Sequence, residues 1–138
     1  MTREEIASLL ETRRLQVTAQ RLDIAEYVLA KPQHLSADQI LSGMRNRGST
    51  VSKATVYNTL NLLSEHGIVR TVQVDPERQY YDSTSSLHHH FYNVDTGELT
   101  DIPDGAVALE VRTALPAGTE QDSVDVVIRV RSSQPGTR

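Results

Sequence analysis

The sequence predicts an α+β protein, with an N-terminal winged helix-turn-helix followed by a small α/β dimerisation domain. The front half has four segments whose apolar residues recur at helical spacing, and the segment after Gly67 changes to strand spacing. Beyond residue 84, short strand-like runs are separated by turn residues. We therefore expect domains at residues 1–83 and 84–131, and a disordered tail at residues 132–138.

The starts of the four helices are marked by residues that favour helix N-caps. Thr2 and Ser36 each precede a Glu or Gln by three positions, which is the pattern of a capping box. Thr18 and Ser52 can cap the second and fourth helices with their hydroxyl groups. The fourth helix should end at His66-Gly67, because glycine readily adopts the left-handed conformation that closes a helix.

A β-hairpin is predicted directly after the fourth helix. Residues 68–74 and 79–82 are strand-like, and residues 75–78 form the turn between them. Helices followed by a hairpin are typical of a winged helix, whose last helix enters the DNA major groove by its N-terminal part. The alternatives are a winged helix that binds protein and a polar helix face that only meets solvent.

Side chains at the start of the fourth helix can contact base edges. They supply hydroxyls, an amide, a cation and a phenol, which are groups that hydrogen-bond bases in the major groove. Arginines earlier in the chain can contact phosphates or the minor groove. The candidate DNA contacts are Arg13, Arg14, Arg21, Ser52, Lys53, Thr55, Tyr57 and Asn58.

Charge and composition restrict the class of function. The net charge is −4, but residues 1–74 hold nine Lys and Arg against seven Asp and Glu, a balance of +2 that suits phosphate. Residues 75–138 hold five against eleven, a balance of −6. The absence of cysteine excludes disulfides, thiolate metal sites and a cysteine nucleophile. No apolar run approaches the roughly 20 residues that span a bilayer, so we expect a cytoplasmic protein with no membrane partner.

The run His88-His89-His90 is the densest chemical signal in the chain. On an extended strand, His88 and His90 point to one face while His89 points to the other. Two convergent imidazoles suit a divalent transition metal. A run of surface histidines is the alternative interpretation.

After the histidines, the back half has predicted strands at residues 91–94, 98–102 and 123–130, and a short helix at residues 106–114. A unit this small has a thin core and commonly needs a partner chain to be stable. The largely apolar last strand indicates two covered faces. We therefore expect a homodimer with this strand at or near the interface.

Several motifs together resemble the ferric uptake regulator family across nearly the whole chain. They are Val17-Thr18-Ala19-Gln20-Arg21, His34-Leu35-Ser36-Ala37-Asp38, residues 54–60, residues 65–69 and the histidine run. Within the family the chain is similar to the iron response regulator branch, through residues 57–61, Tyr81-Asp82-Ser83, Asp101-Ile102 and the lack of cysteine pairs. The resemblance implies a DNA-binding repressor of metal-homeostasis genes rather than an enzyme.

The resemblance also implies a regulatory metal site with donors from both domains. One divalent ion per subunit, Mn²⁺, Fe²⁺ or Zn²⁺, would bind to His34, Asp82, His88, His90 and Asp101. Such an ion would fix the angle between the domains and so match two recognition helices to double-stranded operator DNA. The family's cysteine-bound structural zinc site is missing, because Asn93 and Thr96 stand where its first cysteine pair would fall. Ala108 stands where a second metal site has an acidic ligand.

The sequence does not decide which effector controls DNA binding. In the iron response regulator branch the histidine run is implicated in haem binding, so His88, His89 and His90 are haem candidates, with histidine the axial ligand available. A peroxide-sensing repressor, in which bound iron oxidises a histidine ligand, fits the same donors. A small metalloenzyme is the competing class, but the chain has no nucleophile motif or Gly-rich phosphate loop.

Overall fold

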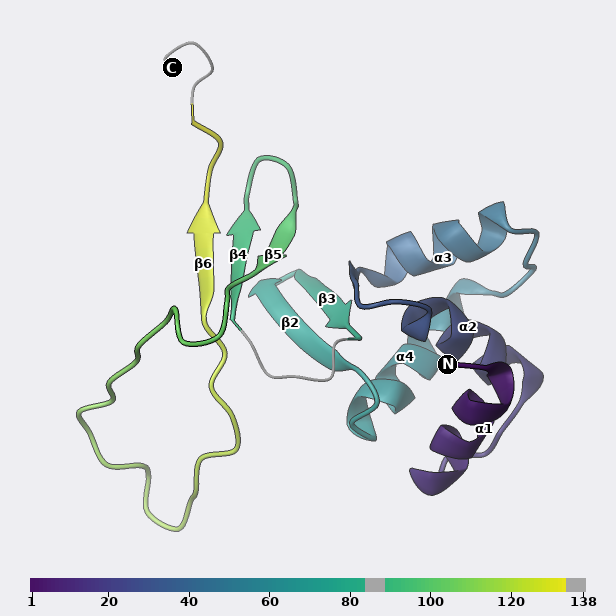
Figure 1. Ribbon diagram of the computed structural model, residues 1–138, viewed down its shortest axis with the longest axis horizontal. Coiled ribbons are helices and arrows are strands. Elements are labelled where there is room, and N and C mark those ends of the chain that lie inside the picture. Colours follow the sequence, from purple (N-terminus) through teal and green to yellow (C-terminus); the bar gives the residue numbers. More distant parts are fainter. Residues whose placement is uncertain (84–88, 134–138) are drawn as a thin grey trace. The chain divides into compact units, whose positions relative to one another are not determined.

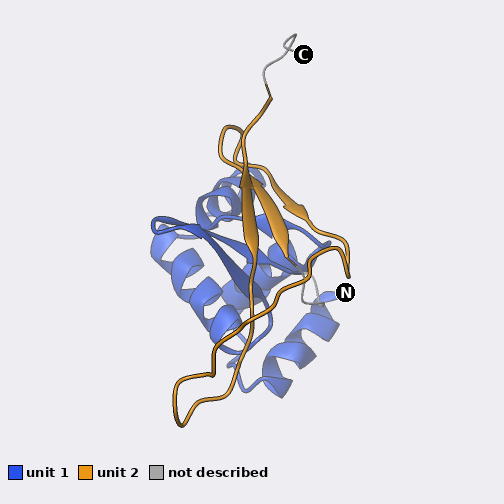
Figure 2. Ribbon diagram, turned by 90° about the vertical axis from the view of Figure 1, so that its left-hand side faces the viewer, with its two compact units in different colours: residues 1–85 blue, residues 86–138 orange. Residues whose placement is uncertain are grey.

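The computed structural model describes residues 1–83 and 89–133, and the chain divides into two compact units, residues 1–85 and 86–138 (Figures 1 and 2). Unit 1 contains four helices and a three-stranded sheet, and unit 2 contains a second three-stranded sheet. Within the described residues, no helix is both long enough and apolar enough to cross a lipid bilayer.

The four predicted helices of unit 1 are confirmed as α1 (Arg3–Thr12), α2 (Ala19–Leu29), α3 (Ala37–Asn46) and α4 (Lys53–Glu65). Both predicted capping boxes form: the Thr2 hydroxyl accepts from the Glu5 N–H at 3.1 Å, and the Ser36 hydroxyl accepts from the Gln39 N–H at 3.2 Å. Gly67 ends α4 with φ +72°, a left-handed conformation that glycine adopts without steric cost.

The core of unit 1 is aliphatic and lies between the helices. Leu10, Ile24, Ile40 and Leu60, one from each helix, are completely buried. Their burial follows from the helical spacing of apolar residues in each segment, which places one apolar stripe on each helix. The core thus packs α4 together with the other helices of unit 1, and the polar face of α4 points outward.

Gly43 allows α2 and α3 to approach closely. A Cβ atom at this position would overlap the phenol of Tyr27, whose ring carries the Arg47 guanidinium 4.8 Å from its centroid. The glycine therefore leaves room for the Tyr27 phenol against α3.

The sheet of unit 1 contains one strand that the sequence did not predict. The predicted hairpin is confirmed as β2 (Arg70–Asp75) and β3 (Arg78–Asp82), and the short strand β1 (His34–Leu35) pairs with β3 to give the antiparallel order β1-β3-β2. Gln33 and Ser83 extend this pairing, because the Ser83 N–H donates to the Gln33 carbonyl and the Gln33 N–H donates to the Ser83 hydroxyl. As a result, His34 lies directly opposite Asp82.

Unit 2 is built around a central strand. β4 (His90–Asn93) pairs antiparallel with β5 (Leu99–Asp101) and parallel with β6 (Val127–Val130), which gives the order β5-β4-β6. In Figure 1 the arrows of β4 and β6 point the same way. The register places His90 directly opposite Asp101.

Two predictions for unit 2 are wrong. Residues 106–114 form no helix, and the last strand covers only Val127–Val130 instead of residues 123–130. An isolated helix of this length is marginal in water, and in the part of the chain that the structure describes Leu109 and Val111 are 56% and 59% exposed, so little burial supports a helix there. Of the predicted tail, residues 134–138 lie outside the described part of the chain.

Candidate metal ligands and DNA-reading helix

The first candidate pair of metal ligands lies in unit 1. His34 on β1 and Asp82 on β3 are direct cross-strand partners, which places their side chains on the same face of the sheet. The His34 Nε2 lies 3.5 Å from the Asp82 carboxylate, whose side chain is only 2% exposed. A buried carboxylate is costly without a cationic or hydrogen-bonding partner, and the His34 imidazole lies beside this one.

The second pair repeats this arrangement in unit 2. His90 on β4 and Asp101 on β5 are again direct cross-strand partners in an antiparallel ladder. The His90 Nε2 lies 3.4 Å from the Asp101 carboxylate, with the histidine side chain 5% and the aspartate side chain 44% exposed. Each unit thus offers one imidazole nitrogen and one carboxylate at its own sheet.

The remaining histidines of the predicted cluster differ from one another. His88 lies outside the described residues. His89 is half-buried, and its Nδ1 accepts a hydrogen bond from the Val126 N–H at 3.0 Å. A neutral histidine that accepts at Nδ1 carries its proton on Nε2, so neither ring nitrogen of His89 offers a lone pair while this bond is made.

The N-terminal part of α4 carries the predicted base contacts. Ser52 caps the helix and shares a 2.8 Å hydrogen bond with the Thr55 hydroxyl, while Asn58 is exposed. The Tyr57 hydroxyl donates to the Asp38 carboxylate on α3 at 2.9 Å, and the Lys53 Nζ lies 5.6 Å from the Tyr57 ring centroid. The hydrogen bond to Asp38 and burial raise the pKa of Tyr57 above its ordinary value.

The three predicted arginines are anchored differently. One guanidinium nitrogen of Arg13 donates to the His66 carbonyl at the end of α4, and one of Arg21 donates to the Gln16 carbonyl, both at 2.8 Å. Arg14 is exposed and adopts φ +64°. Since a guanidinium has five N–H donors, Arg13 and Arg21 keep donors beyond these bonds.

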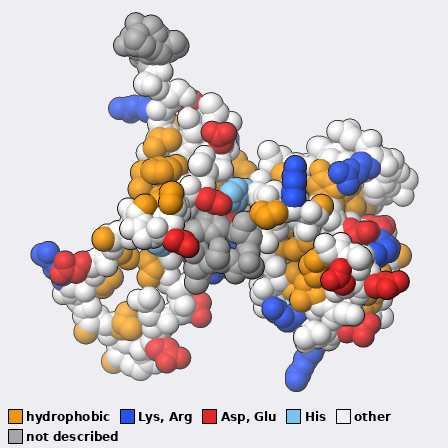
Figure 3. Space-filling model, viewed as in Figure 1, with side chains coloured by type: hydrophobic (Ala, Val, Ile, Leu, Met, Phe, Trp, Pro, Cys, Tyr) orange, Lys and Arg blue, Asp and Glu red, His pale blue; other side chains and the backbone are white. Residues whose placement is uncertain are grey.

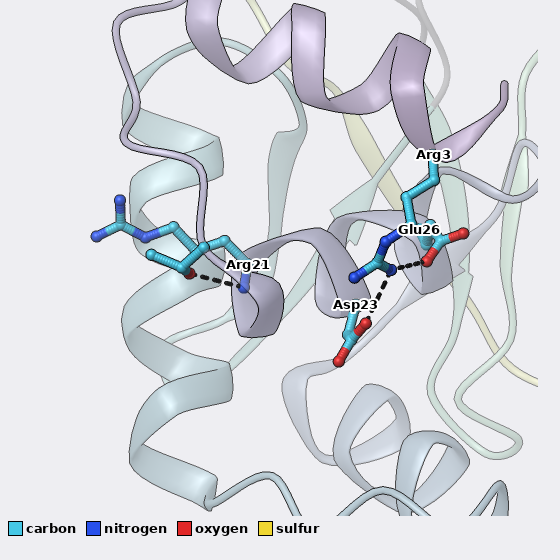
Figure 4. A network of polar contacts seen from close by, with 5 residues as sticks. Arg3, Arg21, Asp23 and Glu26 are labelled. Carbon is cyan, nitrogen blue, oxygen red and sulfur yellow. Dashed lines mark hydrogen bonds and ion pairs between the residues drawn. The ribbon is translucent and has the colours of Figure 1, made fainter.

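A fourth arginine of this region is committed to carboxylates. Arg3 on α1 pairs with Asp23 and Glu26 on α2, as Figure 4 shows. Its charge is thereby paired with two carboxylates on the protein.

Two polar features were missed by the sequence reasoning. One is Asp38, whose partner Tyr57 lies 19 positions along the chain and gives no local pattern. The other is a polar clamp in unit 2, formed by Asn93, Asp95 and Ser132. The Asn93 side chain accepts from the Asp95 N–H at 2.9 Å and donates to the Ser132 hydroxyl at 3.3 Å, and the Asp95 carboxylate accepts from the Ser132 N–H at 2.9 Å.

The fold and the two histidine–aspartate pairs define a winged-helix protein with donors for a metal ion. The model of the ferric uptake regulator family matches residues 12–128. The chain therefore belongs to this family, whose members are metal-responsive, DNA-binding transcription regulators.

Individual relatives agree with this assignment. The peroxide operon regulator of Bacillus subtilis is 30% identical over 104 residues, which cover 73% of this chain and 72% of that protein. The ferric uptake regulator of Vibrio cholerae aligns with a TM-score of 0.73 at 25% identity, covering 91% of this chain and 98% of that one. The Pseudomonas aeruginosa regulator, solved with manganese, aligns with a TM-score of 0.70 at 24% identity, covering 97% and 100%; its likeness supports the fold alone.

Proposed function

We propose that this chain is a homodimeric repressor whose affinity for operator DNA is set by one divalent metal ion per subunit. The proposed ligands are the two histidine–aspartate pairs together with His88, which are His34, Asp82, His88, His90 and Asp101. The single observation that carries the proposal is the repeated geometry of the pairs, at 3.5 Å in unit 1 and 3.4 Å in unit 2.

The donor chemistry fits such an ion. Three imidazoles and two carboxylates supply nitrogen and oxygen without sulfur, a set that suits Mn²⁺ or Fe²⁺, while Zn²⁺ stands higher in the general affinity series. The nearly buried Asp82 carboxylate would gain a strong cationic partner. A bound ion would supply the charge that links the donors of unit 1 to those of unit 2.

The proposed switch acts through the recognition helix. Because His34 belongs to the unit that carries α4 and His90 to the other, an ion shared by both would bias the angle between the units. That angle decides whether two copies of α4 can reach successive major grooves. By reciprocity, metal and operator must change each other's affinity by the same factor.

The test is calorimetric titration of Mn²⁺ and Zn²⁺ into wild type, His34→Ala and His90→Ala, with His66→Ala as the matched control. His66 lies at the end of α4, where its Nδ1 contacts the Leu62 carbonyl of the same helix. We expect each ligand variant to lose at least about tenfold in metal affinity, and the control to keep it. Unchanged affinity in both ligand variants would refute the site.

The finer assignment to the iron response regulator branch is a proposal about the effector. It rests on the sequence resemblance, whereas the 30% identical relative is a peroxide regulator. The Nδ1 bond of His89 to Val126 disfavours haem ligation by that residue, since it must break first. Gel shifts with haem and with Fe²⁺ plus peroxide distinguish the two effectors. Release of the protein from DNA by haem supports the iron response regulator branch. Release by peroxide, together with an oxidised histidine, supports a peroxide regulator.

A further inference from the structure

Tyr57 and Asp38 form a fixed pair at the front of the DNA-reading helix. Tyr57 lies on the first turns of α4, and Asp38 is the second residue of α3, next to the capping box of Ser36 and Gln39. The Tyr57 hydroxyl donates to the Asp38 Oδ1 at 2.9 Å. The Lys53 Nζ lies 5.6 Å from the centroid of the same ring.

The pair is accessible from outside the unit. Both side chains line a hollow of about 540 Å³ between α3, α4 and the β2–β3 hairpin, together with Gln73 and Arg78 of that hairpin. Asp38 is exposed and Tyr57 is half-buried. A base edge that approached α4 would therefore meet a phenol oxygen whose orientation is already set.

Hydrogen-bond chemistry limits what this phenol can offer. An ionised carboxylate has acceptors only, so the Tyr57 proton must point at Asp38. The phenol oxygen then has lone pairs, but no proton, for any other partner. The bond to Asp38, and after it burial, also raise the pKa of Tyr57, which keeps the proton in place at neutral pH.

We propose that Asp38 determines the base preference of Tyr57 by making the phenol an obligate acceptor. In the major groove the exocyclic amino groups of adenine and cytosine are donors, whereas the O6 and N7 of guanine and the O4 of thymine are acceptors. Tyr57 therefore selects an amino group and rejects a carbonyl at one operator position. This role of Asp38 as a specificity-determining residue rests on the proposed DNA-binding function.

The experiment compares base discrimination in wild type, Asp38→Ala and Tyr57→Phe. At each adenine of the preferred operator, hypoxanthine replaces the N6 amino donor by an O6 acceptor, and affinity is measured by fluorescence anisotropy. We expect one position at which wild type loses roughly tenfold or more, the effect of facing two acceptors. If Tyr57 contacts a cytosine instead, the same loss of affinity should be seen when uracil replaces that cytosine.

Asp38→Ala frees the phenol proton, which can then donate to the new carbonyl. Asp38→Ala should therefore reduce the tenfold discrimination between adenine and hypoxanthine to about twofold or less. Tyr57→Phe should also lower this discrimination, because it removes the phenol oxygen that accepts from the amino group. Glu65→Ala, which removes an exposed carboxylate at the other end of α4, is the matched charge control and should keep the wild-type ratio. Removal of charge alone would strengthen binding to every sequence equally and leave the ratio unchanged.

A titration of the free protein tests the contact without DNA. In Asp38→Ala the pKa of Tyr57 should fall toward its ordinary value near 10, because the acceptor that raises it is gone. An unchanged pKa, or an unchanged hypoxanthine ratio in Asp38→Ala, overturns the role of Asp38. If wild type prefers no sequence at all, the proposed function itself is wrong, which is a different result.

Discussion

The side-chain amide of Asn93 donates a hydrogen bond to the Ser132 hydroxyl across 3.3 Å, which joins the β4–β5 turn to the chain beyond β6. The Asp95 carboxylate strengthens the connection by accepting from the Ser132 N–H at 2.9 Å. Asn93 stands where the resemblance to the family leads one to expect a cysteine of a structural zinc site. The polar clamp thus holds the turn by hydrogen bonds between side chains and backbone.

The first prediction concerns this polar clamp. Asn93→Ala should lower the free energy of unfolding by about 0.5–1.5 kcal/mol, because it removes the side-chain acceptor of the exposed Asp95 and Thr96 N–H groups, which water can then solvate. Thermal unfolding with and without a chelator measures this. Thr100→Ala, an exposed position on β5, is the control and should change little. A free energy of unfolding in Asn93→Ala equal to that of wild type would contradict the prediction.

The second prediction separates phosphate contact from base reading. Lys53→Ala should weaken binding to all DNA sequences alike and reduce the slope of log affinity against log salt by about one unit. Tyr57→Ala should instead cost about 1–3 kcal/mol at the preferred operator and blur its specificity. Anisotropy titrations at several salt concentrations decide between these effects. Equal operator binding by Tyr57→Ala and wild type would show that α4 is misplaced.

The third prediction concerns dimer formation by unit 2. Phe91, Ile128 and Val130 on β4 and β6 remain 36–39% exposed, and Figure 3 shows hydrophobic side chains gathered on this part of the chain. Ile128→Asp should therefore shift the protein toward monomer, because a charge cannot be buried there without a partner. Sedimentation at micromolar concentration is the measurement, with Ser42→Asp, at an exposed position on α3 of unit 1, as control. A stable wild-type monomer at that concentration would exclude the homodimer.

The fourth prediction is a pH dependence of α1. The Glu5 carboxylate accepts from the Thr2 N–H at 2.8 Å, and this bond lowers the pKa of Glu5 below its ordinary value. A lowered folded-state pKa gives stability that is present above the ordinary glutamate value and is lost as pH falls through the folded value. Glu5→Gln should reduce this part of the acid sensitivity. NMR titration of the Glu5 carboxyl checks the direction, and a normal or raised value would contradict the capping box.

Much of unit 1 could be predicted from the sequence because its signals are local. Thr2 and Ser36 each form a capping box with a residue three positions later, so the start of each helix can be found locally. The hairpin turn at residues 75–78 is flanked by strand-like runs. Capping and turn chemistry depend on neighbouring residues, so one sequence suffices to find them. The donors His34 and Asp82 came from the family resemblance, and no local spacing joins them.

The features that were missed depend on contacts between distant segments. The two-residue strand β1 has no periodicity of its own and exists because β3 offers a free edge. The predicted helix at residues 106–114 is not formed for a different reason: its sequence permits a helix, but Leu109 and Val111 stay largely exposed among the described residues. Asp38 likewise gained its role only when α3 and α4 packed together.

The parallel pairing of β4 with β6 has a consequence for folding kinetics. β4 and β5 can meet through a short turn, but β6 must reach β4 across the long irregular segment at residues 102–126. Closing such a non-local contact is slow compared with forming local helices. Until β6 arrives, one backbone edge of β4 is open, and the β6 of another copy can occupy it as well as its own. Refolding at high protein concentration should therefore favour strand-exchanged assemblies, whereas dilute refolding should return each β6 to its own chain.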